Sequence, residues 1–316
     1  MTMQAENEKI AHSEPDGVLI VNKHGGVTSH DIVGDIRHIY RTRKVGHTGT
    51  LDPMAEGVLV VLLGRAAKAA EYLVSDRKTY RATLRLGLTT DTEDVTGTVL
   101  STCNTLPDAE TVKQVCNEQF VGKIKQIPPM YSALKVNGQK LCDLARAGKT
   151  VERAPREIEI FSLECTPVEG VPSDYILTVE CSSGTYIRTL CADIGASLGV
   201  GGVMASLVRL EAGGYRIENA VHVKDLRTEN REALFTHLLP TESLFFSLPK
   251  LSLPAFYERL LRNGCSVSQK KLRTDLPVGA RVRLASTNNV FFGLGEVFPE
   301  ENGSESTIKC IKLFLL

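Results

Sequence analysis

The chain is organised around residues 46–64, which read Gly-His-Thr-Gly-Thr-Leu-Asp-Pro-Met-Ala-Glu-Gly-Val-Leu-Val-Val-Leu-Leu-Gly. The last seven residues form a short apolar run that is rich in valine and follows a glycine. This pattern is more typical of a buried strand than of a helix. The first twelve residues contain three glycines and a proline, so they are predicted to form a tight loop that enters the strand.

Asp52 is the notable side chain of this loop. It precedes Pro53, and a residue before proline is pushed out of the α region, so its side chain can project from an extended backbone. A carboxylate on a loop that is held by a buried strand is a plausible place for chemistry. The alternative is an aspartate that closes its own turn. These residues alone leave both interpretations open.

Length and composition limit the class of protein. The chain has 316 residues, 42% of them hydrophobic, which suits one large domain or two domains with a real core. No run of 18 apolar residues is present, so no membrane span is expected. Residues 1–16 are polar at their start and lack an apolar signal segment, so we expect a disordered tail and no targeting peptide.

The eight cysteines contain no Cys-x-x-Cys pair. Zinc is therefore not expected. The cysteines are typical of buried thiols in a reducing compartment, and we expect a cytoplasmic protein.

Charge gives a mixed indication of the partner. The chain has 37 basic and 37 acidic residues, and this balance argues mildly against nucleic acid. A basic cluster nevertheless precedes the Asp52 loop, formed by Arg37, Arg41, Arg43 and Lys44 around Tyr40. The cluster is either a solvated face or an anion-binding surface.

The rest of the chain shows alternating and helical patterns. Tyr80, Ala82, Leu84 and Leu86 share one face of a strand predicted over 78–86. Other strands are predicted at 17–22, 158–165, 175–181, 281–284, 290–294 and 308–316. Helices are predicted from Thr28 or Ser29, over 65–75, 107–120, 141–148, from about Thr185 to Leu198, and over 225–239. We expect a polar loop at 87–97, a turn at Asn137-Gly138 and a linker at 248–254.

Arg188 is an unusual residue in this pattern. It is expected in the first turn of the helix that starts near Thr185, off the apolar face. A cation there opposes the helix dipole, and a nearby carboxylate would compensate. The alternative is an exposed arginine.

Several motifs resemble those of the TruB family of tRNA pseudouridine synthases. They are Gly-His-Thr-Gly-Thr-Leu-Asp-Pro at 46–53, Lys-Thr-Tyr at 78–80, Gln-x-Pro-Pro-x-Tyr-Ser-Ala-x-Lys at 126–135 and Gly-Thr-Tyr-Ile-Arg-Thr at 184–189. The resemblance covers roughly 17–240 well and 248–316 loosely. It implies an α+β fold with a mixed, mainly antiparallel sheet and flanking helices, the pseudouridine synthase fold. It also implies a catalytic domain at 17–247 and a small β-rich, PUA-like RNA-binding domain at 248–316.

The resemblance assigns roles to particular residues. Asp52 would be the catalytic carboxylate, and Arg188 its ion-pair partner, which keeps it ionised. Substrate contacts would come from His47, Tyr80, Tyr186, Leu207 and Lys23, with Tyr80 stacked on the target base. Leu207 lies in a segment, 205–210, that resembles a further strand of the family. The chain departs from the family pattern at His24 in place of a proline, Cys142 in place of a tyrosine and Val208 in place of an arginine.

The implied reaction turns uridine into pseudouridine in the T-loop of tRNA, at position 55. It is an isomerisation, so neither a cofactor nor a metal is expected. The target base must be extruded from its loop. Whether the aspartate attacks the sugar or the base stays open. The expected partner is the T-arm of tRNA, and the expected state is a monomer.

Other classes of function compete. A guide-RNA-dependent pseudouridine synthase is one alternative, and a non-catalytic tRNA-binding or tRNA-folding protein is another. A phosphate-loop enzyme would need Gly-Lys-Ser/Thr opening a helix, whereas this loop has Leu-Asp-Pro.

Overall fold

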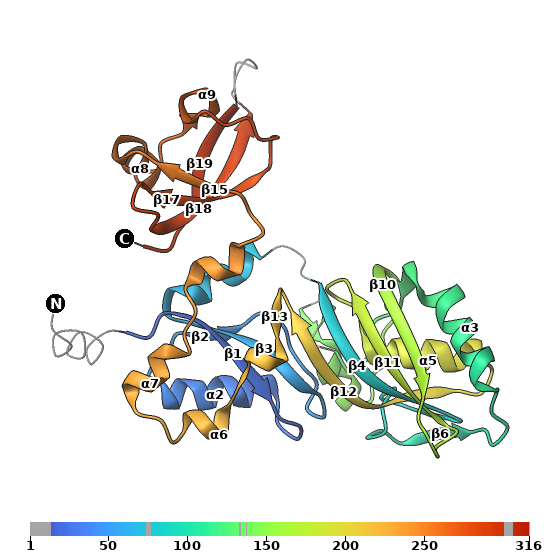
Figure 1. The fold of residues 1–316 in the computed structure, drawn as a ribbon. Helices are drawn as coiled ribbons and strands as arrows, with labels where there is room; N and C mark the ends of the chain where they lie inside the picture. Colours follow the sequence, from blue (N-terminus) through green and yellow to red (C-terminus); the bar gives the residue numbers. More distant parts are fainter. Residues whose placement is uncertain (1–13, 74–76, 133, 137, 300–305, 316) are drawn as a thin grey trace.

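The structure is a computed structural model that describes residues 14–73, 77–132, 134–136, 138–299 and 306–315 (Figure 1). Most of the expected N-terminal tail, 1–13, lies outside the described residues. Asp16, at the end of that tail, is fixed, because its carboxylate accepts a hydrogen bond of 2.8 Å from the Arg65 backbone N–H. No helix in the described part of the chain is long and apolar enough to cross a membrane.

One large sheet of ten strands forms the body of the molecule. The strand order is β14-β1-β3-β12-β4-β11-β10-β7, with β2 beside β3 and β13 beside β12. The strands are β1 (Gly17–Lys23), β2 (Val45–His47), β3 (Glu56–Leu63), β4 (Lys78–Leu86), β7 (Gly122–Gln126), β10 (Arg156–Pro167), β11 (Asp174–Cys181), β12 (Gly202–Ala212), β13 (Tyr215–Arg216) and β14 (Val221–His222). Only the β1–β14 and β3–β12 pairs of this sheet are parallel. The mixed, mainly antiparallel sheet predicted from the sequence is therefore confirmed.

Strand β3 is the buried strand expected after the Asp52 loop. Every residue from Gly57 to Leu63 is buried, because both faces of the strand are covered. Leu59, Val61 and Leu63 belong to one core cluster, and Val58, Val60 and Leu62 belong to another. A strand that is covered on both sides needs apolar residues at every position, which explains the continuous run in the sequence.

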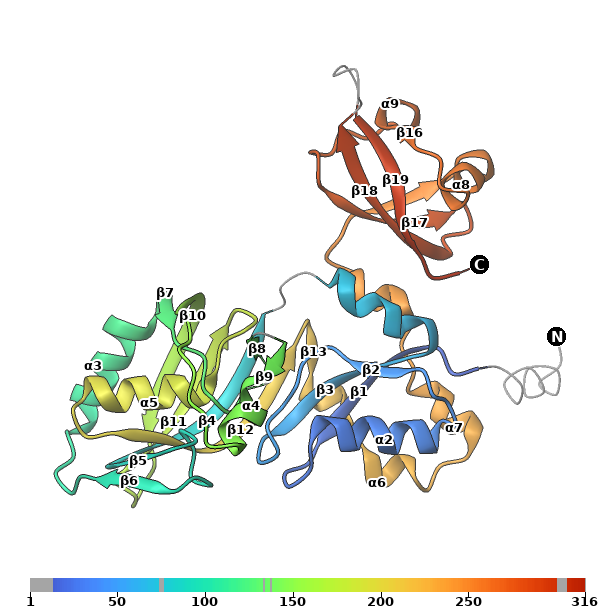
Figure 2. The same cartoon turned by 180° about the vertical axis from the view of Figure 1, so that it is seen from behind.

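The helices cover the two halves of the sheet separately. Helix α2 (Ser29–Ile39) packs against β1 and β3, and Thr28 caps it by accepting a hydrogen bond from the Asp31 N–H. Helices α3 (Ala109–Phe120) and α5 (Ile187–Ser197) cover the half that contains β4, β10 and β11. Figures 1 and 2 show these two groups of helices at opposite ends of the sheet.

Two of the predicted helices are corrected. The helix expected over 225–239 is two short helices, α6 (Val223–Leu226) and α7 (Arg231–Thr236). The break occurs because Asn230 starts a new helix, its side chain accepting a hydrogen bond of 2.9 Å from the Ala233 N–H. The alanine-rich segment expected as a helix over 65–75 is the 3-10 helix η1 (Gly64–Tyr72), and 74–76 lie outside the described residues.

Small elements fill the connections. The polar loop expected at 87–97 begins with strand β5 (Leu88–Thr90), which pairs with β6 (Val99–Thr102). Strands β8 (Lys135–Val136) and β9 (Gln139–Lys140) lead into helix α4 (Leu141–Arg146). Asn137, half of the expected turn, lies outside the described residues. The 3-10 helices η2 (Ile217–Asn219) and η3 (Thr241–Phe245) follow later in the chain.

The C-terminal part forms a second sheet of five strands, ordered β15-β17-β18-β19-β16. Its elements are β15 (Lys250–Leu253), α8 (Ala255–Arg262), β16 (Val267–Ser268), α9 (Gln269–Leu272), β17 (Arg281–Ser286), β18 (Phe291–Pro299) and β19 (Ser306–Leu313). This small β-rich unit was predicted, but the linker expected at 248–254 is wrong for its central residues. Lys250–Leu253 pair in parallel with β17, so they belong to the sheet.

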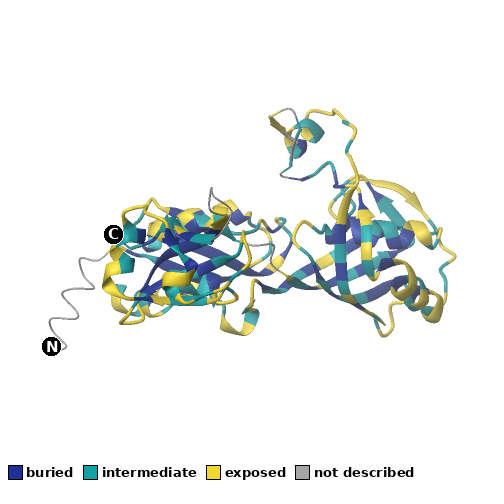
Figure 3. Ribbon diagram, turned by 90° about the horizontal axis from the view of Figure 1, so that it is seen from above, coloured by how far each residue is buried: buried dark blue, intermediate teal, exposed yellow. Residues whose placement is uncertain are grey.

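The C-terminal unit has its own core and also rests on the larger part. Leu253, Leu261 and Phe292 belong to its internal cluster, and Figure 3 shows buried residues inside both parts. A second cluster joins Phe245 of η3 to Phe291 and Phe314, with ring centroids 6.2 and 5.8 Å away. The interface therefore contains an aromatic cluster.

Candidate active site

The Asp52 loop connects β2 to β3 and is held at several points along its length. Strands β2 and β3 are antiparallel neighbours, so the loop must turn back within a few residues. The Ser29 hydroxyl accepts a hydrogen bond of 2.8 Å from the Leu51 N–H and donates one of 3.2 Å to the Leu51 carbonyl. The Pro53 carbonyl accepts a hydrogen bond of 2.8 Å from the Gly26 N–H. The start of α2 and the turn after β1 thus fix the loop on both sides of Asp52.

The buried side chain of Lys23 also holds the Asp52 loop in place. Its side chain is fully buried, and its ammonium donates to the carbonyls of Ala55, His24 and Pro53 at 2.6, 3.0 and 3.2 Å. Burial lowers the pKa of Lys23 to about 8. The structure thus places this predicted substrate contact beneath the loop, where its N–H donors are directed at backbone oxygens.

Asp52 and Arg188 form the ion pair that the sequence led us to expect. Arg188 Nε lies 2.8 Å from Asp52 Oδ2, and Arg188 Nη2 lies 3.2 Å from Asp52 Oδ1. The side chain of Asp52 is 33% exposed, whereas that of Arg188 is 5% exposed. The guanidinium therefore holds the carboxylate from behind and leaves part of it open to a ligand. Asp52 therefore has a bidentate partner in a distant segment and does not only close its own turn.

The Arg188 guanidinium makes two further hydrogen bonds. It donates to the carbonyls of Tyr131 and Thr92, at 2.8 and 3.1 Å. The loop that carries Thr92 is shaped by Asp94, whose carboxylate accepts from the Thr92 hydroxyl at 2.8 Å and from the Thr96 N–H at 2.9 Å. Three segments far apart in sequence therefore converge on one guanidinium, which fixes its direction toward Asp52.

Gln126 fixes the start of α5, two residues before Arg188. Its side-chain amide donates to the Tyr186 carbonyl at 3.0 Å and accepts from the Tyr186 N–H at 2.8 Å. Gln126 is 2% exposed. Sequence reasoning did not select it as a site residue, although it opens the Gln-x-Pro-Pro element. Tyr186 itself is half-buried, and its hydroxyl makes no hydrogen bond to another residue that the structure describes.

Tyr80 and Leu207 lie on adjacent strands in the centre of the sheet. Tyr80 is 7% exposed and Leu207 is 6% exposed. Burial raises the pKa of Tyr80, and the nearby charge of Asp52 adds to this effect. The tyrosine is therefore within electrostatic reach of the candidate carboxylate.

His47 lies at the end of β2, where the loop begins. Burial lowers the pKa of His47, so the ring favours its neutral form. Its Nδ1 is buried and has no hydrogen-bond partner among the residues that the structure describes. A buried polar atom of this kind is costly unless a ligand or water satisfies it.

Arg209 is the site residue that the sequence analysis missed. It is 2% exposed and is among the largest fully buried side chains. Its Nε donates to the Val58 carbonyl at 2.7 Å, and its Nη2 donates to the Gly49 carbonyl at 3.0 Å. It therefore contacts both the Asp52 loop and the strand that follows it. The sequence could have indicated Arg209, because it lies two residues after Leu207 and therefore on the same face of the strand.

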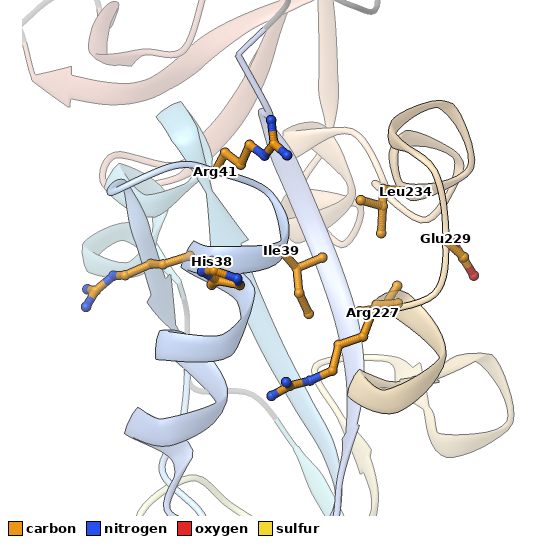
Figure 4. A pocket seen from close by; sticks show the side chains of 8 residues that line it. His38, Ile39, Arg41, Arg227, Glu229 and Leu234 are labelled. Atoms are coloured by element: carbon orange, nitrogen blue, oxygen red, sulfur yellow. The ribbon is translucent and has the colours of Figure 1, made fainter.

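A pocket of about 600 Å³ lies elsewhere, between the C-terminal end of α2 and helices α6 and α7. Figure 4 shows Arg41 and Arg227 on either side of Ile39. Two arginines of the basic cluster line it, and none of the candidate site residues does; its lining is Arg37, His38, Ile39, Arg41, Leu226, Arg227, Glu229 and Leu234. In the described part of the chain, no three His, Cys, Asp or Glu residues come together as a metal site.

Comparison with protein families agrees with this arrangement. A model described as the TruB family pseudouridylate synthase N-terminal domain matches residues 37–187, which include Asp52 and Tyr80. A model described as the tRNA pseudouridylate synthase B C-terminal domain matches residues 188–245. The chain belongs to the TruB family of pseudouridylate synthases. By this membership it is an enzyme, an isomerase that makes pseudouridine.

Curated relatives match this TruB-family chain over most of its length. The protein named tRNA pseudouridine synthase B of Clostridium kluyveri is 39% identical over 95% of this chain and all of its own length. The protein of the same name from Clostridium perfringens strain 13 is 41% identical over 89% of this chain and 95% of its own length.

Solved structures support the fold. The structure titled a Cbf5-Nop10-Gar1 complex contains a chain with a TM-score of 0.75 and 25% identity, which covers 97% of this chain and 87% of that one. A structure titled H/ACA RNP bound to a substrate RNA containing 2′-deoxyuridine gives a TM-score of 0.71 at 22% identity, covering 98% of this chain and 87% of that one. The pseudouridine synthase fold expected from the motifs is confirmed, including the C-terminal β unit.

Proposed function

We propose that this TruB-family enzyme converts uridine to pseudouridine at position 55 in the T-loop of tRNA, with Asp52 as its essential carboxylate. The observation that carries the proposal is the Asp52–Arg188 pair, with a partly open carboxylate 2.8 Å from a buried guanidinium. An ion pair held in this way keeps the carboxylate aimed at a fixed point. The near full-length similarity to proteins named tRNA pseudouridine synthase B supports tRNA as the substrate.

The reaction breaks the N1–C1′ bond, turns the base and joins C5 to C1′. The hydrogen at C5 is lost and N1 gains one, so the atoms balance without an oxidant or a group donor. Asp52 can assist as a nucleophile toward the sugar or toward the base. Tyr80 would stack on the extruded uracil, Leu207 and Tyr186 would line its surroundings, and the free Nδ1 of His47 would meet the substrate. Lys23 would fix the loop that carries Asp52.

The expected partner is the T-arm of tRNA, bound by one copy of the chain in the cytoplasm. The guide-RNA-dependent alternative shares the fold but is less well supported, because relatives about 40% identical carry the tRNA enzyme's name. A purely RNA-binding protein would not need the Asp52–Arg188 pair. We also expect neither a cofactor nor a metal to be required.

The test is to incubate the purified protein with unmodified tRNA, without cofactors and with a chelator, and to measure pseudouridine by nucleoside analysis. Asp52→Asn should bind tRNA within about threefold of the wild type and show no detectable turnover, because the amide loses the charge that carries the chemistry. The matched control is Asp174→Asn, because Asp174 forms a similar bidentate pair with Arg85, at 2.9 and 2.7 Å, at the far end of β4.

The outcomes separate the alternatives. Turnover by the control but not by Asp52→Asn supports the proposal. Substantial turnover by Asp52→Asn contradicts the role of Asp52. If the wild type binds tRNA without converting it, the non-catalytic alternative holds.

A further inference from the structure

Arg209 is a buried cation for which the proposed mechanism has no role. It forms no ion pair with an acidic side chain in the described part of the chain, and its Nε and Nη2 donate hydrogen bonds to the carbonyls of Val58 and Gly49. Burying a guanidinium costs free energy that two backbone hydrogen bonds offset only in part. An apolar residue would fill the same space without this cost, so the position has a use besides packing.

The place of Arg209 in the sheet indicates that use. Strand β12 lies between β3 and β4, and Arg209 is in register with Gly57 on one side and Tyr80 on the other. A Cβ on Gly57 would lie 2.2 Å from the Arg209 carbonyl oxygen, so β3 and β12 approach closely at this point. Arg209 therefore lies in β12 at the point where this strand contacts both β3, which follows Asp52, and β4, which carries Tyr80.

The Arg209 side chain reaches both of these neighbours. Residues directly opposite each other in an antiparallel pair have side chains on the same face, and the guanidinium is close enough to lower the pKa of Tyr80 against the larger, opposite effect of burial. On the other side, its hydrogen bond of 3.0 Å to Gly49 fixes a residue three positions before Asp52. The planar guanidinium can serve both partners at once, which a single ammonium cannot.

We propose that Arg209 is a positioning residue that holds Tyr80 and the Asp52 loop together as one unit. The inference rests on the proposed function, because it concerns how the base-stacking ring is placed relative to the carboxylate. Arg209 acts through these two groups and needs no contact with the substrate. Misplacing reacting groups by about 1 Å can reduce a rate by about 10²-fold.

The first experiment separates kcat from binding. Arg209→Met and Arg209→Lys should lower the single-turnover rate on tRNA by about 10²-fold and at least about tenfold, respectively, with tRNA affinity within about threefold of the wild type. Arg85→Lys is the matched control, because it weakens a hydrogen-bonded arginine of β4 away from the site, and it should change the rate by less than about twofold. Arg209 variants that fold and keep the wild-type rate overturn the inference.

A double-variant cycle with Tyr80→Phe then tests whether the two groups act together. Groups that act as a unit give strongly non-additive effects on rate. In the Tyr80→Phe background, Arg209→Lys should lower the rate by less than about threefold further. If the two reductions multiply in full, Arg209 and Tyr80 act independently and the inference is wrong.

A second variant keeps the test decisive if the Arg209 variants do not fold. A Cβ on residue 49 would already be in van der Waals contact with Arg209 Nη1, at 3.5 Å. The two further methyl groups of Gly49→Val should therefore compete with the guanidinium for space and lower the rate about tenfold or more. An unchanged rate contradicts the inference. A wild-type protein that makes no pseudouridine overturns the proposed function together with this inference, whereas an active wild type with insensitive variants overturns the inference alone.

Discussion

Lys23 gives the active-site loop an anchor that depends on pH. Burial lowers its pKa from 10.5 to about 8, so between these values the folded chain has lost a proton that the unfolded chain still binds. Stability rises with pH wherever the unfolded state binds more protons. We therefore predict that the free energy of unfolding of the wild type, minus that of Lys23→Met, increases as pH rises from about 8 to about 10.5. Denaturant unfolding at several pH values measures it, and a flat or falling difference contradicts the prediction.

At the residue scale, the Asp52–Arg188 pair could be predicted from the sequence, whereas the buried contacts that hold the pair in place could not. Asp52 and its pairing with Arg188 follow from the motifs that resemble the TruB family, whereas a cation in a first helical turn indicates only that some carboxylate would compensate Arg188. The burial of Lys23 and Arg209 could not be predicted, because burial of a charge depends on carbonyls from distant segments. Gln126 is similar, since its two hydrogen bonds go to a residue 60 positions later.

At the element scale, the contact between β3 and β12 has a strict requirement at Gly57. Its φ is +98°, and a Cβ there would lie 2.2 Å from the Arg209 carbonyl oxygen, which is rigid backbone. We predict that Gly57→Ala lowers the free energy of unfolding by about 3 kcal/mol or more. Gly214→Ala is the control, because its φ is +81° with open space around the Cβ, and it should lose only about 1–2 kcal/mol. Equal losses in denaturant unfolding would show that strain alone, and not the close approach, matters at Gly57.

Strands with a clear pattern were predicted well, and elements that depend on partners were not. The alternation of Tyr80, Ala82, Leu84 and Leu86 gave β4 with its buried face. The segment 250–253 is flanked by prolines and was expected as a linker, but it pairs with β17, a contact that no local pattern reveals. The break between α6 and α7 depends on Asn230 acting as a cap, a choice that the apolar pattern alone does not specify.

At the scale of the whole molecule, the net charge of zero is the sum of two parts of opposite charge. Residues 248–316 contain ten Lys and Arg and six Asp and Glu, a net charge of +4, and the rest of the chain is therefore −4. A basic module beside an acidic catalytic part fits a division in which the C-terminal unit supplies phosphate contacts. The balanced composition was therefore a poor guide to the partner, because binding depends on where the charges lie.

The two parts meet at an interface that a truncation would open. Phe245 is 2% exposed because Phe291 and Phe314 cover it. Ion pairs add to the contact, Lys312 with Glu71 at 2.8 Å and Arg283 with Glu242 at 3.0 Å. The core clusters of the catalytic part nevertheless consist of residues before 247. The larger part therefore has a core of its own.

We predict that a chain ending at Ser247 folds with reduced stability and still converts tRNA, because Asp52, Tyr80, Arg188 and Arg209 are all retained. Its tRNA affinity should fall about tenfold or more, and the slope of log affinity against log salt should become shallower, since each lost phosphate contact removes about 0.9 from it. Filter binding at several salt concentrations measures both. Full-length Lys271→Glu and Lys309→Glu, at exposed positions, should reduce the slope without uncovering Phe245. An insoluble truncated chain, or unchanged affinity and slope, would mean that the C-terminal unit is part of the catalytic fold and not a separate RNA-binding module.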